Sequence, residues 1–288
     1  MLSDCVEMRR KEGYYSSMPD SHTTATLNYL VATGERPIYI ASRGGADAAL
    51  KIGAEFEEKE VVVHDARLLR PPASLDKEGF ALCQHATAVT DFYQLEGVKA
   101  LYEAEITELV RAATGASELL AFDHTLRSDS PTVRGEHATR ETASVIHNDY
   151  TDASARKRLL DLLEAGTAEQ RLQHRFAIIN VWRSIRGTVW NSPLTCCDAS
   201  TLEPGDLVAS ERRAHDRIGE LELVSWNPAH RWYYYPEMTF SESLLIKTYD
   251  SAQDGRATRT IHSAFDNTLA PPAAPPRESI ESRLLVFY

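Results

Sequence analysis

The sequence predicts a mainly β protein, a sandwich or barrel of closely spaced strands with flanking helices. Short runs rich in β-branched and aromatic residues recur along the second half of the chain, separated by turn signals. Apolar residues at helical spacing appear in the stretch 95–113. At 288 residues the chain can hold one large β-rich domain. We therefore expect a single domain over residues 1–288, in which the weakly patterned residues 1–35 form an N-terminal arm.

Composition narrows the class of protein. Hydrophobic residues make up 43% of the chain and charged residues 25%, and the formal net charge is −11. An acidic balance of this size argues against a nucleic-acid partner, which would need a basic surface. No apolar run is long enough to cross a bilayer, and the polar N-terminus lacks the apolar core of a signal peptide. The four cysteines lack zinc-site spacing, so we expect free thiols in a cytoplasmic protein without a membrane partner.

The first half of the chain is expected to hold strands around one long helix. Val98, Leu101 and Tyr102 begin the apolar stripe of this helix, and Gly115 stands where a C-terminal glycine would end it. The polar stretch 123–136 is expected to be a loop that overhangs a site as a lid. The glycines of 42–45 lack nucleotide-binding spacing. The expected strands of this half are 37–41, 60–67 and 118–122.

The second half is expected to be dominated by strands. Thr151 is a fair N-cap for a helix that ends at Gly166. The stretch 176–183 reads as a nearly continuous apolar strand, with Trp182 on one face and Arg183 on the other. The remaining expected strands are 206–209, 221–226, 231–235, 243–249, 258–263 and 279–288.

The most informative stretch is 144–151, a β-branched run that contains a His-x-Asp motif. On a strand, His147 and Asp149 share one face, which places a nitrogen ligand beside a carboxylate ligand. Two histidines and one carboxylate form the facial triad typical of non-haem Fe(II) oxygenases. For the bare motif the commoner interpretation is a strand end where the two side chains bond to each other or to loop backbone. His262 on a late strand is the candidate third ligand, whereas His174, His215 and His230 lie in polar stretches and are expected to be solvated.

Arg277 and Ser279 form a possible carboxylate clamp where the last strand begins. An arginine donates two parallel hydrogen bonds to a carboxylate, and a hydroxyl two residues away can add a third. This arrangement suits the distal carboxylate of 2-oxoglutarate. The alternative is a surface arginine paired with Glu278 or Glu281. The order of His-x-Asp, distant His and Arg-x-Ser favours the clamp.

These motifs, together with several aromatic and proline-containing stretches, resemble the natural-product hydroxylase/desaturase family. That family includes gibberellin desaturase and the oxygenase component of cephamycin methoxylation. The resemblance runs from about Ile38 to the C-terminus. It is carried by His147-Asn148-Asp149-Tyr150-Thr151, Asn180-Val181-Trp182-Arg183, Pro193-Leu194, Cys197-Asp198, Trp232-Tyr233-Tyr234-Tyr235-Pro236, His262-Ser263-Ala264-Phe265-Asp266 and Pro276-Arg277-Glu278-Ser279-Ile280-Glu281.

The resemblance implies a double-stranded β-helix, a cupin-like jelly roll, that binds Fe(II), 2-oxoglutarate and O2. It implies that His147, Asp149 and His262 hold iron and that Arg277 holds the co-substrate; Arg183 or Arg283 is an alternative anchor. Such an enzyme would hydroxylate, desaturate or cyclise a small natural-product or amino-acid-derived substrate by abstracting hydrogen from a C–H bond.

Two other classes of protein remain open from the sequence. One is a cupin-like isomerase or hydrolase that binds a metal without 2-oxoglutarate, and the other is a non-catalytic jelly-roll binding module. The substrate and the oligomeric state stay open as well. Trp182, Trp232, Tyr233 and Tyr235 could line a substrate pocket, although core packing is the commoner role of such residues.

Overall fold

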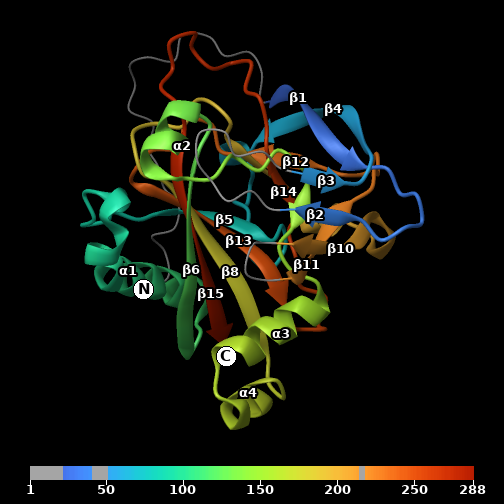
Figure 1. Cartoon of the computed structure of the whole chain (residues 1–288), viewed down its shortest axis with the longest axis vertical. Helices are drawn as coiled ribbons and strands as arrows, with labels where there is room; N and C mark the ends of the chain where they lie inside the picture. Colours follow the sequence, from blue (N-terminus) through green and yellow to red (C-terminus); the bar gives the residue numbers. More distant parts are fainter. Residues whose placement is uncertain (1–21, 41–50, 214–217) are drawn as a thin grey trace.

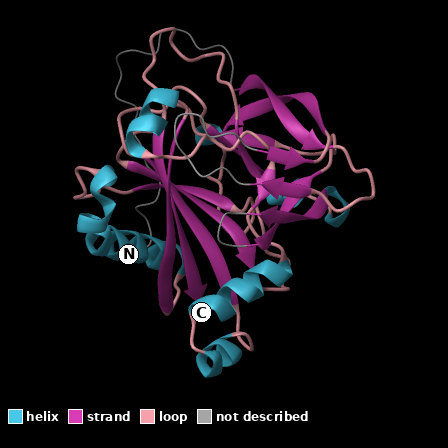
Figure 2. Cartoon of the chain, in the orientation of Figure 1, coloured by secondary structure: helices cyan, strands magenta, loops and turns pink. Residues whose placement is uncertain are grey.

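The computed structural model describes residues 22–40, 51–213 and 218–288. Two curled β-sheets pack against each other, and the helices lie at the periphery (Figures 1 and 2). The mainly β prediction is confirmed. The larger sheet has the spatial order β1 (His22–Leu30), β4 (Phe56–Asp65), β12 (Trp232–Tyr234), β9 (Leu194–Cys197), β14 (His262–Ala264), β7 (His147–Asn148), β11 (Ile218–Val224), β10 (Leu207–Arg213), β2 (Ile38–Ile40) and β3 (Lys51–Gly53).

The smaller sheet is antiparallel and forms the most buried part of the molecule. Its spatial order is β5 (Phe80–Gln84), β13 (Glu242–Asp250), β8 (Phe176–Ser184), β15 (Glu278–Phe287) and β6 (Glu118–Ser128). Every residue of its three central strands is buried, because both faces of the sheet are covered. The helices are α1 (Leu95–Thr114), α2 (Pro131–His137), α3 (Asp152–Leu162) and α4 (Ala165–Arg171), with 3-10 turns at Ala66–Leu68, Phe92–Gln94, Ala199–Thr201 and Pro204–Asp206.

The two faces of the smaller sheet have different neighbours. The outer face packs against α1, whose Tyr102, Ile106 and Val110 are fully buried against apolar side chains of β8 and β15. The inner face meets the larger sheet in an apolar cluster to which Trp182 of β8 and Cys196 of β9 both belong. A further apolar cluster lies beneath α3 and α4 and covers one end of the smaller sheet. A polar site can therefore lie between the sheets, shielded from water by apolar layers.

Several predicted elements are confirmed close to their expected bounds. The long helix ends where the sequence indicated, since Gly115 adopts the left-handed conformation with φ 69° and donates its amide to Arg111. Thr151 caps α3 through a capping box with Ser154. The strand at 176–183 is β8, and its two-residue periodicity places Trp182 and Arg183 on opposite faces as expected, with Trp182 facing the larger sheet.

Other predictions were wrong. The stretch 123–136 is not a loop: β6 continues to Ser128 because β15 pairs with it along its length, and α2 follows. The helix expected to end at Gly166 instead ends at Leu162, and Gly166 lies inside α4. The strand around His-x-Asp is reduced to the two residues of β7, and the strand expected at 258–263 is β14.

Residues 1–21 of the expected N-terminal arm lie outside the described residues. Cys5, the glycines of 42–45 and His215 lie outside them as well. Within the described part, residues 22–30 form β1, which pairs antiparallel with β4 and buries Ala25, Leu27 and Tyr29. Among the described residues, no helix is long and apolar enough to cross a membrane.

Candidate metal centre

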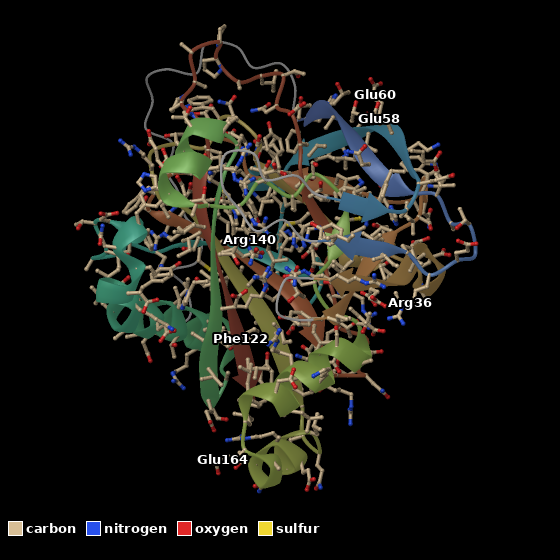
Figure 3. The ribbon with its side chains drawn as sticks, viewed as in Figure 1. Arg36, Glu58, Glu60, Phe122, Arg140 and Glu164 are labelled. Atoms are coloured by element: carbon tan, nitrogen blue, oxygen red, sulfur yellow. The ribbon has the colours of Figure 1, made fainter. Side chains whose placement is uncertain are left out.

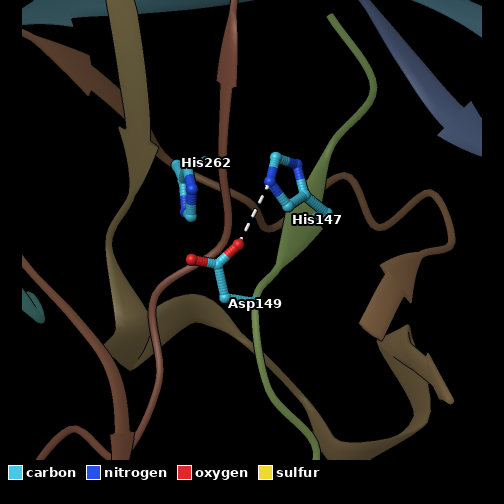
Figure 4. A group of neighbouring side chains, drawn as sticks. All are labelled: His147, Asp149 and His262. Atoms are coloured by element: carbon cyan, nitrogen blue, oxygen red, sulfur yellow. Dashed lines mark ion pairs between the residues drawn. The ribbon is translucent and has the colours of Figure 1, made fainter. Parts of the chain in front are cut away.

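The larger sheet brings the two predicted histidine ligands together. His147 of β7 and His262 of β14 are direct partners across antiparallel strands, and their ring centroids lie 4.6 Å apart. Asp149 follows β7 immediately, and its Oδ1 lies 3.6 Å from Nε2 of His147. The three side chains point toward one another, with their potential ligand atoms within 4.8 Å (Figure 4). This donor set is the 2-His-1-carboxylate combination that suits iron.

Backbone carbonyls orient both imidazoles. Nδ1 of His147 lies 2.8 Å from the carbonyl of Val145, and Nδ1 of His262 lies 3.1 Å from the carbonyl of Thr260. A carbonyl can only accept, so each Nδ1 carries the proton and each Nε2 keeps a free lone pair. Burial, followed by the neighbouring His147, lowers the pKa of His262, which favours the neutral form that a metal ligand needs.

The carboxylate of Asp149 is held with one oxygen bonded and the other directed at the histidines. Its Oδ2 accepts hydrogen bonds from Nδ2 of Asn180 at 2.7 Å and from Nε of Arg283 at 2.9 Å. Burial by itself raises the pKa of Asp149, but Arg283, followed by the two imidazoles, holds that pKa well below its usual range. Asp149 is therefore ionised and ready to bind a cation.

Arg283 is the centre of a buried charge network. Besides Asp149, it donates from Nη1 to Asp123 at 2.6 Å and from Nη2 to Glu281 at 2.9 Å. Asn180 also joins the two acids, since its Nδ2 donates to Glu281 at 2.8 Å. Each of the three nitrogens of Arg283 already donates to a carboxylate, which leaves Arg283 little capacity to anchor a co-substrate.

The predicted clamp residues Arg277 and Ser279 are buried, and the guanidinium of Arg277 has no counter-ion among the described residues. Arg277 is 2% exposed; its Nε donates to Oγ of Ser279 at 3.1 Å, and its Nη1 donates to the carbonyl of Ser192 at 2.5 Å. Among the described residues no carboxylate forms an ion pair with it, and burial, followed by Arg127, lowers the pKa of Arg277 to about 9. The guanidinium lies 5.1 Å from the ring of Trp182, whose buried indole N–H has no acceptor among those residues. A buried cation and a buried donor without partners together fit an incoming carboxylate.

Arg183 lies on the face of β8 opposite to that of Asn180 and Trp182. Its guanidinium donates to the carbonyls of His85 and Phe240, and it lies over the rings of Phe92 and Phe240 on the side covered by α1. It does not point to the side of the sheet that carries Asn180 and Asp149.

A polar cavity of about 220 Å³ opens beside the triad. His147 and Asp149 line it, whereas His262 and Arg277 are almost fully buried and do not. The cavity is lined by side chains from both sheets, α3 and the segment 140–143. Its charged lining includes the arginines Arg127, Arg140, Arg158, Arg212 and Arg283 and the acids Asp123, Glu141, Asp149, Asp161 and Glu220.

The other residues considered from the sequence are structural. Trp232 and Tyr235 are buried in apolar clusters, so core packing is their role. His230 is not solvated as expected: its side chain is fully buried, and its ring nitrogens bond Asp206 and Tyr29. Asn180 was not predicted from the sequence as a site residue. A polar side chain among apolar neighbours on a buried strand needs polar partners, and this was the available signal.

Comparison with known proteins places the chain in a family. A model described as "Oxidoreductase/YMDC permease-like domain" matches residues 27–287. The hydroxylase/desaturase efuI of Hormonema carpetanum is 33% identical over 81% of this chain and 85% of its own length. The Fe(II)/2-oxoglutarate-dependent dioxygenase nvfI of Aspergillus novofumigatus is 31% identical over 79% of this chain and 83% of its own. The chain belongs to this family of Fe(II)/2-oxoglutarate-dependent oxygenases.

The solved structures agree. The iron and α-ketoglutarate-dependent endoperoxidase NvfI superposes with a TM-score of 0.80 at 26% identity, covering 93% of this oxygenase and 98% of NvfI. The predicted jelly-roll core, the enzyme class and the requirement for Fe(II), 2-oxoglutarate and O2 are confirmed by this membership. Enzymes of this family act on small molecules and depend on 2-oxoglutarate, so membership excludes both the isomerase or hydrolase without 2-oxoglutarate and the non-catalytic binding module.

Proposed function

We propose that His147, Asp149 and His262 hold the iron of this oxygenase and that Arg277 and Ser279 hold the distal carboxylate of 2-oxoglutarate. The observation that carries the second assignment is the buried Arg277 guanidinium, which has no carboxylate partner in the part of the chain that the structure describes. The orphaned N–H of Trp182 beside it supports the same carboxylate position. Of the three arginines considered, Arg283 is already engaged by three acids and Arg183 lies behind β8.

Each protein group has a definite task in this assignment. Bound iron supplies the activation of O2 that, coupled to decarboxylation of 2-oxoglutarate, oxidises a C–H bond of the substrate. The backbone carbonyls behind His147 and His262 fix the ring tautomers, and Arg283 with Asn180 keeps Asp149 ionised and oriented. The apolar layers around the site exclude water from the reaction.

The substrate in this proposal is a small natural product that is hydroxylated, desaturated or cyclised, acted on by a single domain spanning 1–288. The hydroxylase/desaturase names of the relatives support this class of substrate and outcome. We also propose that the enzyme works in the cytoplasm without nucleic-acid or membrane partners. The buried free thiols of Cys196 and Cys197 suit a reducing compartment. A fluorescent fusion found in an oxidising compartment would contradict that location.

The residue assignments are tested by anaerobic titration with Fe(II) and then 2-oxoglutarate. A weak visible charge-transfer band should form in the wild type and be absent in His147→Ala. Arg277→Met should weaken 2-oxoglutarate binding by roughly 10- to 100-fold, because it removes hydrogen bonds to a charged group. Arg183→Lys is the matched control and should bind 2-oxoglutarate as the wild type does. Loss of the band in Arg183→Lys but not in Arg277→Met would reverse the assignment.

A further inference from the structure

Three arginines converge on the cavity beside the triad. Arg127 of β6 and Arg140 are bridge partners on neighbouring parallel segments, and Arg212 lies on β10 of the other sheet. All three line the cavity that His147 and Asp149 also line. Figure 3 labels Arg140 in the region between the two sheets, away from the outer edge where Glu58 lies.

Two of these arginines have no counter-ion. Among the described residues, neither Arg140 nor Arg212 forms an ion pair or a side-chain hydrogen bond, although both are only partly exposed. Arg127 donates from Nη1 to the carbonyl of Glu141, and its Nε lies 3.9 Å from Glu281, beyond hydrogen-bond distance. The acids nearest the triad are already taken by Arg283.

This arrangement is unfavourable in the free enzyme. Like charges placed side by side across neighbouring strands repel, and partial burial reduces the screening by water. Burial, followed by Arg127 and Arg212, lowers the pKa of Arg140. The two sheets nevertheless hold the three cations around one open space, which an anion of suitable size would stabilise.

We propose that Arg140 and Arg212 bind an anionic carboxylate of the substrate, so that the oxygenase acts on an organic acid. The inference rests on the function proposed above, because it assigns the co-substrate carboxylate to Arg277 and leaves the cavity to the substrate. Both arginines line the same cavity as His147 and Asp149, so the anchored acid occupies the space beside the iron ligands. Tyr39, which pairs in register with Arg212, lines the same wall and adds an apolar ring to the cavity.

The test uses benzoate and benzamide as probes of equal size that differ in charge. Binding is measured by calorimetry on the anaerobic holoenzyme with Fe(II) and saturating 2-oxoglutarate, so that the co-substrate site is filled. Benzoate should bind at least tenfold more tightly than benzamide. Arg140→Gln and Arg212→Gln should each weaken benzoate binding about tenfold or more and leave benzamide binding unchanged.

Arg213→Gln is the matched control. Arg213 follows Arg212 on β10 but pairs with Glu211 at the surface and does not line the cavity. Its loss should leave benzoate binding unchanged. Arg140→Gln should also raise the melting temperature of the ligand-free enzyme by about 1–2 °C, because it relieves like-charge repulsion. A structural role for Arg140 would lower that temperature instead.

The possible outcomes are distinct. Equal binding of benzoate and benzamide, or wild-type benzoate binding in both glutamine variants, overturns the proposal. A fall in 2-oxoglutarate affinity in Arg140→Gln and Arg212→Gln, with Arg277→Met unaffected, would show that this cluster holds the co-substrate. If the wild type forms no visible band with 2-oxoglutarate, the proposed function fails. Weaker benzoate binding in Arg140→Gln and Arg212→Gln than in the wild type then still reports whether the carboxylate site exists.

Discussion

Replacing Arg283 by glutamine should impair metal binding by changing the charge behind Asp149. Arg283 donates to Asp149 at 2.9 Å, to Glu281 at 2.9 Å and to Asp123 at 2.6 Å. Breaking a buried ion pair by removing one partner typically destabilises a protein by about 3–5 kcal/mol. Losing a group that orients a metal ligand typically weakens metal binding by about 10- to 100-fold. We expect Arg283→Gln to show both effects.

The pH dependence of metal binding distinguishes the effect on Asp149 from a general loss of stability. In the wild type the pKa of Asp149 lies well below the usual range of an aspartate. Asp149 therefore stays ionised at mildly acidic pH, and its protonation does not limit metal binding there. Without Arg283, burial and the neighbouring Glu281 raise the pKa of Asp149. Protons then compete with the metal for Asp149, and the acid limit of binding moves to higher pH.

The assay is a titration with Co(II), a spectroscopic substitute for Fe(II), at a series of pH values. Arg175→Gln is the matched control, because Arg175 forms a two-point ion pair with the buried Asp250 far along the sheet. It should lose stability without losing metal affinity. Equal Co(II) affinity and an unchanged acid limit in Arg283→Gln and Arg175→Gln would refute the reasoning.

Three further predictions follow from other contacts. Gly79→Ala should lower the melting temperature by several degrees, since φ is +87° and an added Cβ would lie 2.1 Å from Oγ1 of Thr260; an unchanged melting curve would contradict this. Burial raises the pKa of Cys197 to about 12, so peptide mapping should find it unalkylated by iodoacetamide at pH 8 until the protein is unfolded. Co(II) should raise the melting temperature of the wild type and not that of Asp149→Ala, because a ligand stabilises only the state that binds it; an equal rise in both would exclude Asp149 as a ligand.

The strands and the helix that were predicted well are those whose own residues show the periodicity of the element. The stretch 176–182 is apolar and rich in β-branched residues apart from Asn180, and α1 shows a clear helical stripe ended by Gly115. The polar end of β6 shows no such signal. Residues 123–128 are a strand because β15 supplies hydrogen-bond partners from the far end of the chain. The bounds of β7 were similarly set by its short pairing with β11 and β14.

The sequence by itself determined which ligand types the site offers, because the two-residue period of a strand already puts His147 and Asp149 on one face. Only the tertiary structure decided that His262 lies opposite His147, since register between distant strands depends on how the whole sheet packs. The same holds for the arginines. Arg277 and Arg283 look alike in sequence, but the guanidinium of Arg283 bonds three acids, whereas that of Arg277 forms no ion pair with a described residue. The neighbours of a buried charge come from strands far away in the chain.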